Sequence, residues 1–103
     1  MSDDLVRAYI EHAKTQAPDL FDAWIQVYLT VRNDREAAWE LVLKLVDAAA
    51  GDSAVLGAIG AGPLEDLIRL YPVPILERAE AEATHNPPFA EALETTYYPG
   101  HGL

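Results

Sequence analysis

The fold is decided by residues 57–71, which read Gly57-Ala-Ile-Gly-Ala-Gly-Pro-Leu-Glu-Asp-Leu-Ile-Arg-Leu-Tyr71. Three glycines give the backbone in the first half of this stretch conformational freedom. Pro63 suits the first position of a helix, where its missing N–H costs nothing. We expect Gly62 to cap that helix, because Glu65 then falls in the first turn, where the helix dipole favours a carboxylate. The stretch therefore predicts a corner between two helices.

The same glycines do not match a nucleotide-binding motif. Gly57 and Gly62 have P-loop spacing, but proline and leucine follow where lysine and a hydroxyl residue would bind phosphate and magnesium. A dinucleotide motif starting at Gly60 would have Glu65 at its third glycine position, and that carboxylate would repel pyrophosphate. We therefore predict no cofactor. Gly60 or Gly62 is instead expected to allow a positive φ or a close backbone approach.

Length and composition indicate one domain over residues 1–103, with residues 95–103 as a loosely ordered tail. Half of the residues are hydrophobic, which is enough for a core without metal or disulfide bonds. Cysteine is absent, which excludes disulfides and thiolate catalysis. No signal-peptide pattern occurs, and no apolar run approaches the roughly 18 residues of a membrane span. We expect a cytoplasmic protein without a membrane partner.

Apolar residues recur with helical spacing, and no useful segment alternates with a period of two. The chain is therefore predicted to be all-α: a compact bundle of six or seven short helices, with α-solenoid-like antiparallel helix pairs as one arrangement. The expected helices are 3–15 (capped by Ser2), Leu20 to about Val31, Asp34 to Ala50, Asp52 or Ser53 to Ile59, Pro63 to Tyr71, about Val73 to His85, and Pro88 to about Thr96.

The segment from Asp34 to Ala50 is expected to be the central helix, because its charged residues occupy a narrow strip and the rest is apolar. Asn33 and Glu36 have the spacing of a capping box at its start. The helix before it has one broad apolar face, formed by Phe21, Trp24, Ile25 and Tyr28 and extended by Leu20, Val27 and Val31.

Catalytic and metal-binding patterns are missing. The histidines His12, His85 and His101 are far apart, so the helical metal-binding spacing does not occur. Ser2 and Ser53 stand where helices begin, and capping explains both. The carboxylates fall on solvent faces, and no calcium-binding loop is present. We predict no catalytic residue, no metal site and no enzymatic activity.

Charge is the strongest indication of a partner. Seventeen acidic residues face seven basic ones, for a formal net charge of −10. Direct nucleic-acid binding is not expected, because no basic patch can form to release counterions. A basic protein partner is expected instead, bound by a monomer. The alternative is that the acidity serves solubility alone.

Basic residues are scarce after Arg69, where five carboxylates face a single arginine. Arg78 is the only lysine or arginine beyond that point, and we expect it to pair with Glu82 four residues on. If the last two helices pack side by side, their outer faces form one negative surface. The predicted partner-binding residues are Glu77, Glu80, Glu91, Glu94, Tyr97 and Tyr98. An ordinary solvated face is the alternative.

Several strings between about Trp39 and Leu93 resemble an uncharacterised family of small bacterial domains. They are Trp39-x-x-Val42-Leu43, Val55-Leu-Gly-Ala-Ile-Gly-Ala-Gly-Pro-Leu-Glu-Asp-Leu67, Ile75-Leu76-Glu77-Arg78 to Glu82-Ala83, and Asn86-Pro-x-Phe89-x-x-Ala92-Leu93. The Gly-Ala-Gly-Pro-Leu-Glu-Asp-Leu string is a signature of that family, although it implies no function. Pro72 and Pro74 depart from the polar turn expected there.

Two functions are considered. Small acidic helical proteins are similar in style, though not in motif, to immunity proteins of bacterial toxin systems. The first hypothesis is an immunity-type or inhibitory module that neutralises a basic protein partner such as a toxin. The alternative is a phage-type inhibitor of a nucleic-acid-binding protein that mimics nucleic acid with an extended double row of carboxylates. An immunity protein should instead combine acids with an exposed aromatic anchor, for which Trp24, Tyr97 and Tyr98 are candidates.

Overall fold

The computed structural model describes residues 3–16 and 18–96, and every regular element in these ranges is helical. This confirms the predicted all-α fold. None of the helices in these ranges has the length and apolarity needed to cross a membrane. The elements are α1 (Asp3–Thr15), the short 3₁₀ turn η1 (Pro18–Leu20), α2 (Phe21–Asn33), α3 (Arg35–Ala48), α4 (Ser53–Ile59), the π-helical turn η2 (Gly60–Leu64), α5 (Glu65–Leu70), α6 (Pro72–Ala83) and α7 (Pro87–Glu94).

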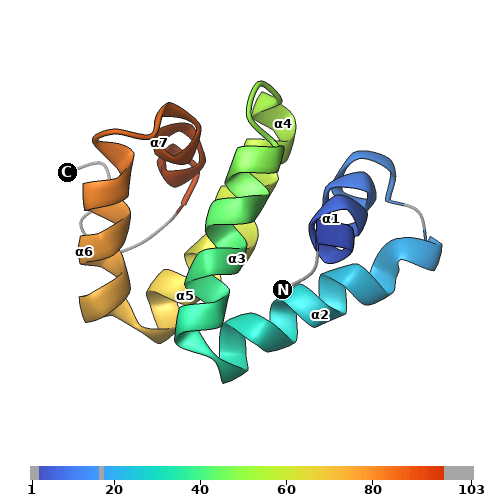
Figure 1. Ribbon diagram of the computed structural model, residues 1–103, viewed down its shortest axis with the longest axis horizontal. Coiled ribbons are helices and arrows are strands. Elements are labelled where there is room, and N and C mark those ends of the chain that lie inside the picture. Colours follow the sequence, from blue (N-terminus) through green and yellow to red (C-terminus); the bar gives the residue numbers. More distant parts are fainter. Residues whose placement is uncertain (1–2, 17, 97–103) are drawn as a thin grey trace.

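Helix α3 lies in the middle of the molecule, with α1 and α2 on one side and α6 and α7 on the other (Figure 1). It contacts α1, α2, α4, α5 and α7. A solenoid differs from this arrangement, because each of its units touches only its neighbours. The buried side chains of α3 are Ala38, Leu41, Val42, Leu45 and Val46. Trp39 and Leu43 are partly buried and pack against the edge of this core. Helix α3 is therefore packed on several sides, as predicted.

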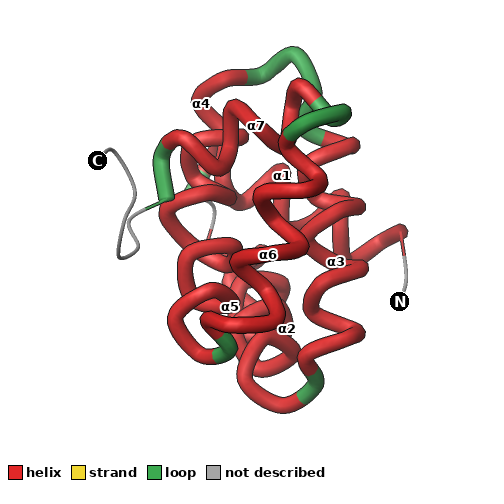
Figure 2. The backbone as a smooth tube through the Cα atoms, turned by 90° about the vertical axis from the view of Figure 1, so that its left-hand side faces the viewer, coloured by secondary structure: helices red, strands yellow, loops and turns green. Residues whose placement is uncertain are grey.

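Short loops join the helices (Figure 2), and side-chain caps start three of them. The caps are Asp34, Asp52 and Asn86, and each accepts a hydrogen bond of 3.1 to 3.2 Å from the backbone N–H three residues on. The predicted capping box at Asn33 and Glu36 is wrong by one position. Asn33 is still the last helical residue of α2, whereas Asp34 has an extended backbone (φ −149°) that turns its carboxylate back onto α3.

The glycine-rich stretch is a kinked helix rather than a capped corner. Helix α4 continues through η2 into α5, and within η2 only Gly62 has non-helical angles, φ −112° and ψ −105°. No side-chain cap starts α5, so the prediction that Gly62 caps a new helix is wrong. The kink is explained by Pro63, which cannot donate a backbone hydrogen bond and lies buried inside the turn.

Gly60 is the point where the α4–η2 segment meets α7. A Cβ at this position would collide with the carbonyl oxygen of Ala92 and with the Thr95 hydroxyl. The Thr96 hydroxyl donates to the Gly60 carbonyl at 2.7 Å, and Thr96 itself is buried. The predicted close backbone approach is therefore confirmed at Gly60, while no positive φ occurs at Gly60 or Gly62. Absence of a side chain is what allows this contact.

Gly60→Ala is expected to destabilise the protein by about 2–3 kcal/mol or more, because the added methyl group forces two backbones apart in a packed core. The free energy of unfolding, measured by urea denaturation, checks this.

Gly57→Ala is the matched control. Gly57 lies one helical turn earlier in α4, and a Cβ there would meet the Thr95 side chain at 3.7 Å, an ordinary contact. This variant should be neutral or more stable by up to about 1 kcal/mol, since alanine favours a helix over glycine. Equal unfolding free energies for the two alanine variants would contradict the assigned contact between Gly60 and α7.

Candidate functional site

The predicted acidic surface is spread over α6 and α7, which pack against each other. Glu77 and Glu80 are exposed on α6; on α7, Glu94 is exposed and Glu91 is partly buried. Two of the four carboxylates border one hollow of about 360 Å³, lined by Pro72, Val73, Leu76, Glu77 and Glu80. Val73 is 78% exposed. The structure thus brings Glu77 and Glu80 together around an apolar patch, and this hollow does not include Glu91 or Glu94.

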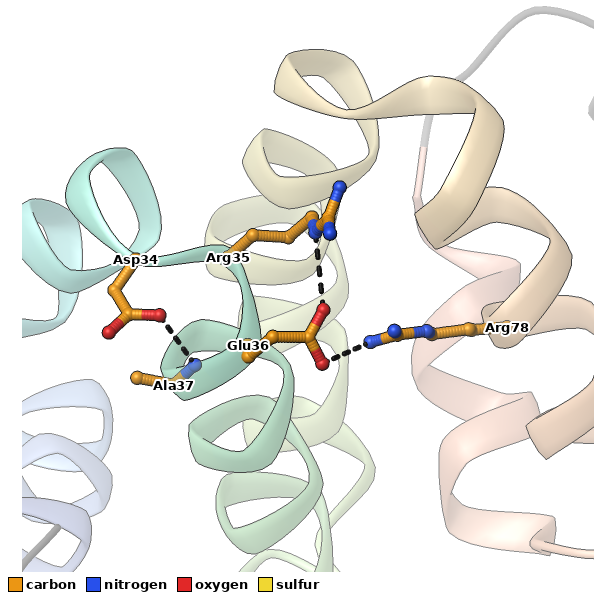
Figure 3. A network of polar contacts seen from close by, with 5 residues as sticks. All are labelled: Asp34, Arg35, Glu36, Ala37 and Arg78. Carbon is orange, nitrogen blue, oxygen red and sulfur yellow. Dashed lines mark hydrogen bonds and ion pairs between the residues drawn. The ribbon is translucent and has the colours of Figure 1, made fainter.

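Arg78 pairs across the molecule rather than along its own helix. Its guanidinium donates to Glu36 Oε1 at 2.9 Å, while the Arg35 Nε donates to Oε2 of the same carboxylate at 3.2 Å (Figure 3). The predicted pair between Arg78 and Glu82 is therefore wrong. Glu82 instead accepts a hydrogen bond from the Asn86 side chain at 2.8 Å. Its carboxylate is therefore bound by a residue of the loop between α6 and α7. Arg78 instead ties α6 to the start of α3.

The hydrogen bond from Arg78 holds the pKa of the Glu36 carboxyl below its ordinary value, and Arg35 adds to this effect. The same contact raises the pKa of the Arg78 guanidinium. Both groups are exposed, so this pair orients α6 relative to α3 more than it stabilises the fold.

The predicted aromatic anchors have different outcomes. Tyr97 and Tyr98 lie outside the described residues. Trp24 belongs to an exposed aromatic stripe on α2, which we define as Phe21, Trp24 and Tyr28; their exposed fractions are 47%, 40% and 39%. Phe21 and Trp24 stack with ring centroids 5.5 Å apart, and Trp24 and Tyr28 stack at 5.3 Å. The stacked rings form one continuous aromatic surface that is exposed to water.

Small side chains explain why this stripe points outward. Ala23, Val27 and Val31 are the buried residues of α2, and they repeat every four positions along one side of the helix. Short side chains let α2 approach α1 and α3 closely, which leaves the larger rings beside the contact. The broad apolar face predicted for this helix is thus divided into a buried part and an exposed aromatic part. The spacing of the small residues was the signal that could have revealed the division.

Arg32 lies at one end of the aromatic stripe. The guanidinium carbon of Arg32 lies 3.4 Å from the centroid of the Tyr28 ring, and its NH2 is 3.5 Å from Asp66 Oδ2. The Arg32 carbonyl accepts a hydrogen bond from the Tyr71 hydroxyl at 3.4 Å. At the other end, the His12 ring lies 6.0 Å from Phe21. The stripe therefore runs along α2 from α1 to α5.

Two hollows adjoin the stripe and share Tyr9, Trp24 and Gly62. The smaller has a volume of about 40 Å³ and lies between α1, α2 and η2; it is lined by Tyr9, Trp24, Val27, Tyr28, Val31, Gly62, Pro63 and Asp66. The larger, about 200 Å³, extends toward His12 and Gln16. We call the smaller one the Tyr9 cavity. Its lining combines three aromatic rings with one carboxylate and contains no lysine or arginine.

Tyr9 is the buried polar residue of this cavity, with only 5% of its surface exposed. Burial, and secondarily the nearby Asp66 carboxylate, raises the pKa of Tyr9 to about 12. The phenol therefore stays neutral near pH 7. No described residue forms a hydrogen bond with its hydroxyl.

Metal binding is not indicated by the described part of the chain, in which no three potential ligands among histidine, aspartate and glutamate gather into a group. His12 and His85 lie on different elements, α1 and the α6–α7 loop. His101 is outside the described residues.

Arg78→Ala should raise the pKa of Glu36 toward its ordinary value, because the hydrogen bond that favours the carboxylate is lost. A depressed pKa contributes stability that is present above the unfolded pKa and is lost as pH falls through the folded one. The variant should therefore be less stable than the parent at pH 7, and the difference should shrink below about pH 4. NMR titration of the Glu36 carboxyl and urea melts at both pH values test this; an unchanged Glu36 pKa would contradict it.

Tyr9→Phe should remove the tyrosine that ionises near pH 12. A raised pKa contributes stability that is complete below the unfolded value of about 10 and is lost as pH rises toward 12. The parent should therefore lose more stability between pH 9 and pH 11.5 than the phenylalanine variant, as measured by thermal melts with absorbance at 295 nm. Tyr28→Phe, which alters an exposed ring, is the control. If both variants lose the same amount of stability between pH 9 and pH 11.5, Tyr9 is not the tyrosine whose pKa is raised by burial.

Comparisons with known proteins place the chain in a family. Neither the curated proteins nor the solved structures provide a match. A family described as one of unknown function matches residues 11–98, which include Trp24, Tyr28 and Asp66 of the Tyr9 cavity but not Tyr9 itself. The match also contains the strings between Trp39 and Leu93 and extends beyond them to α2 and the end of α1. The chain therefore belongs to the family of unknown function DUF6869.

Proposed function

We propose that this protein is an acidic protein-binding module that neutralises a basic protein partner in the manner of an immunity or inhibitory protein. The observation that carries the proposal is the exposed aromatic stripe on the surface of a chain with a net charge of −10. Aromatic residues are enriched at the energetic centres of protein interfaces. A chain that is this acidic attracts a basic surface over long distances.

The aromatic stripe favours this function over a nucleic-acid mimic. A mimic needs carboxylates spaced along an extended double row and gains nothing from a stacked apolar surface. A protein-binding module uses both features, because charge steers the encounter and a buried aromatic anchor slows dissociation. This proposal also includes a bacterial origin, a toxin as the partner, and a role for the Gly60–Leu67 string as a family signature. It assigns no catalytic role and a monomeric state.

In this proposal, Glu77, Glu80, Glu91 and Glu94 supply the steering charge. The hollow bordered by Glu77 and Glu80 adds an apolar patch that a partner can cover. Since these carboxylates lie on α6 and α7, and the aromatic stripe lies on α2, the partner would be guided by one surface and held by the other.

The test requires the partner, which we would capture with the purified protein as bait and confirm with recombinant components. Changing all four glutamates to glutamine should lower the association rate several-fold at low salt and flatten its salt dependence, because steering acts mainly on association. Stopped-flow or surface-binding kinetics at two salt concentrations measure this. Circular dichroism checks that the variant is folded.

The matched control removes the same charge elsewhere: Asp19→Asn, Asp22→Asn, Glu40→Gln and Asp47→Asn change exposed acids on η1, α2 and α3. We expect a smaller effect from this control. If both four-fold variants slow association equally, only net charge matters and α6 and α7 are not a docking surface. If no basic protein binds at all, the proposed function is wrong.

A further inference from the structure

The Tyr9 cavity contains none of the carboxylates that supply the steering charge. Its lining includes Tyr9, the carboxylate-bearing residue Asp66, and the aromatic residues Trp24 and Tyr28. Building on the proposed function, we propose that this cavity receives an arginine side chain from the surface of the basic partner.

Size limits the occupant. A bound water molecule needs roughly 10–15 Å³ of such space, so a volume of about 40 Å³ accommodates about three. That is room for a small headgroup of a few heavy atoms. A guanidinium fits this description, whereas an aromatic ring or a nucleotide does not.

The lining has the chemistry that a guanidinium requires. Planar guanidinium groups stack on aromatic faces and also form hydrogen bonds with carboxylates. Arg32 donates to Oδ2 of Asp66. Among the described residues, no donor is bound to Oδ1, so that oxygen can accept a hydrogen bond from a partner's arginine. The Asp66 side chain is 34% exposed, which lets an outside group reach it. The Tyr9 hydroxyl, which has no hydrogen-bond partner among the described residues, offers an additional acceptor.

The protein already binds one guanidinium in this way. Arg32 lies over the Tyr28 ring at 3.4 Å and pairs with Asp66 at 3.5 Å. Arg32 does not line the Tyr9 cavity, however, so its position leaves the cavity unfilled. A partner arginine would use the same ring and carboxylate from the cavity side.

Gly62 keeps the cavity open. A Cβ at this position would point toward the Tyr9 hydroxyl and would lie 3.5 Å from it. Any larger side chain at the kink would therefore take up the space between Gly62 and Tyr9. The glycine at the α4–α5 kink also leaves the room that an arginine headgroup would occupy.

The first experiment uses N-acetyl-arginine N-methylamide as the probe, with the isosteric neutral citrulline compound as the control ligand. The chain has two tryptophans, so ¹⁵N-labelled protein gives two indole N–H signals, one from Trp24 and one from Trp39. We expect the arginine compound to shift the Trp24 signal with a dissociation constant on the order of millimolar, as for a ligand of this size. The Trp39 signal should not move, and citrulline should have at most a small effect.

Two variants locate the site. Asp66→Asn keeps the shape of the side chain and removes its charge, so it should weaken probe binding about three- to tenfold. Its matched control is Asp22→Asn, which removes the same charge from an exposed residue of α2 that does not line the cavity. This variant should bind the probe like the parent. Gly62→Ala narrows the cavity and should abolish the Trp24 shift. Circular dichroism confirms that each variant is folded.

The partner complex then separates this inference from the proposed function. Asp66→Asn should speed dissociation of the complex with little effect on association, because a short-range contact acts on the dissociation rate. A Trp24 signal that does not respond to the probe, or that responds equally in Asp66→Asn, overturns the arginine site. Self-association through Trp24, detected by sedimentation, would also overturn it. Loss of steering by the α6–α7 glutamates concerns the proposed function and leaves the probe result unaffected.

Discussion

The close contact between Gly60 and helix α7 constrains the rest of the structure. With no side chain at this position, the Ala92 carbonyl and the two threonine hydroxyls of residues 95 and 96 reach the α4–η2 backbone directly. Helix α7 then covers α3 and α4 and buries Phe89 against the edge of Trp39, with ring centroids 5.6 Å apart. The position of α7 in turn fixes α6, which packs against it. One missing Cβ therefore sets how the C-terminal half closes on the central helix.

The N-terminal half depends on small side chains in a similar way. Ala23, Val27 and Val31 let α2 pack closely, and the stacked rings of Phe21, Trp24 and Tyr28 are left at the surface. Burying such rings would be favourable, and in the function that we propose a partner covers them. In the function that we propose, charge on α6 and α7 acts at long range, and the Tyr9 cavity acts at contact. Figure 1 shows α3 lying between α6 and α7 on one side and α1 and α2 on the other.

Much of the fold could be predicted from the sequence because helical periodicity and capping are local. The all-α class, the central α3 and the close approach at Gly60 follow from apolar spacing and glycine placement. Contacts between distant residues could not be predicted in the same way. Arg78 pairs with Glu36, 42 positions away, instead of Glu82 on its own helix. The kink at Gly62 depends on the burial of Pro63, which only the packed structure determines.

The candidate site was less predictable for the same reason. Trp24 was a candidate anchor, but a helix that is apolar on most sides does not reveal which side will be buried. The Tyr9 cavity combines residues from α1, α2, η2 and α5, so no local pattern could place Tyr9 beside Asp66.

The most direct test of the account is the solvent accessibility of Trp24, measured by acrylamide quenching of its fluorescence in a Trp39→Phe variant. The account predicts that acrylamide quenches Trp24 readily in the free protein, because its ring is exposed. In the complex with the basic partner, the quenching should fall several-fold. Resistance to quenching in the free protein would contradict the exposed aromatic stripe, and undiminished quenching in the complex would contradict its role in binding.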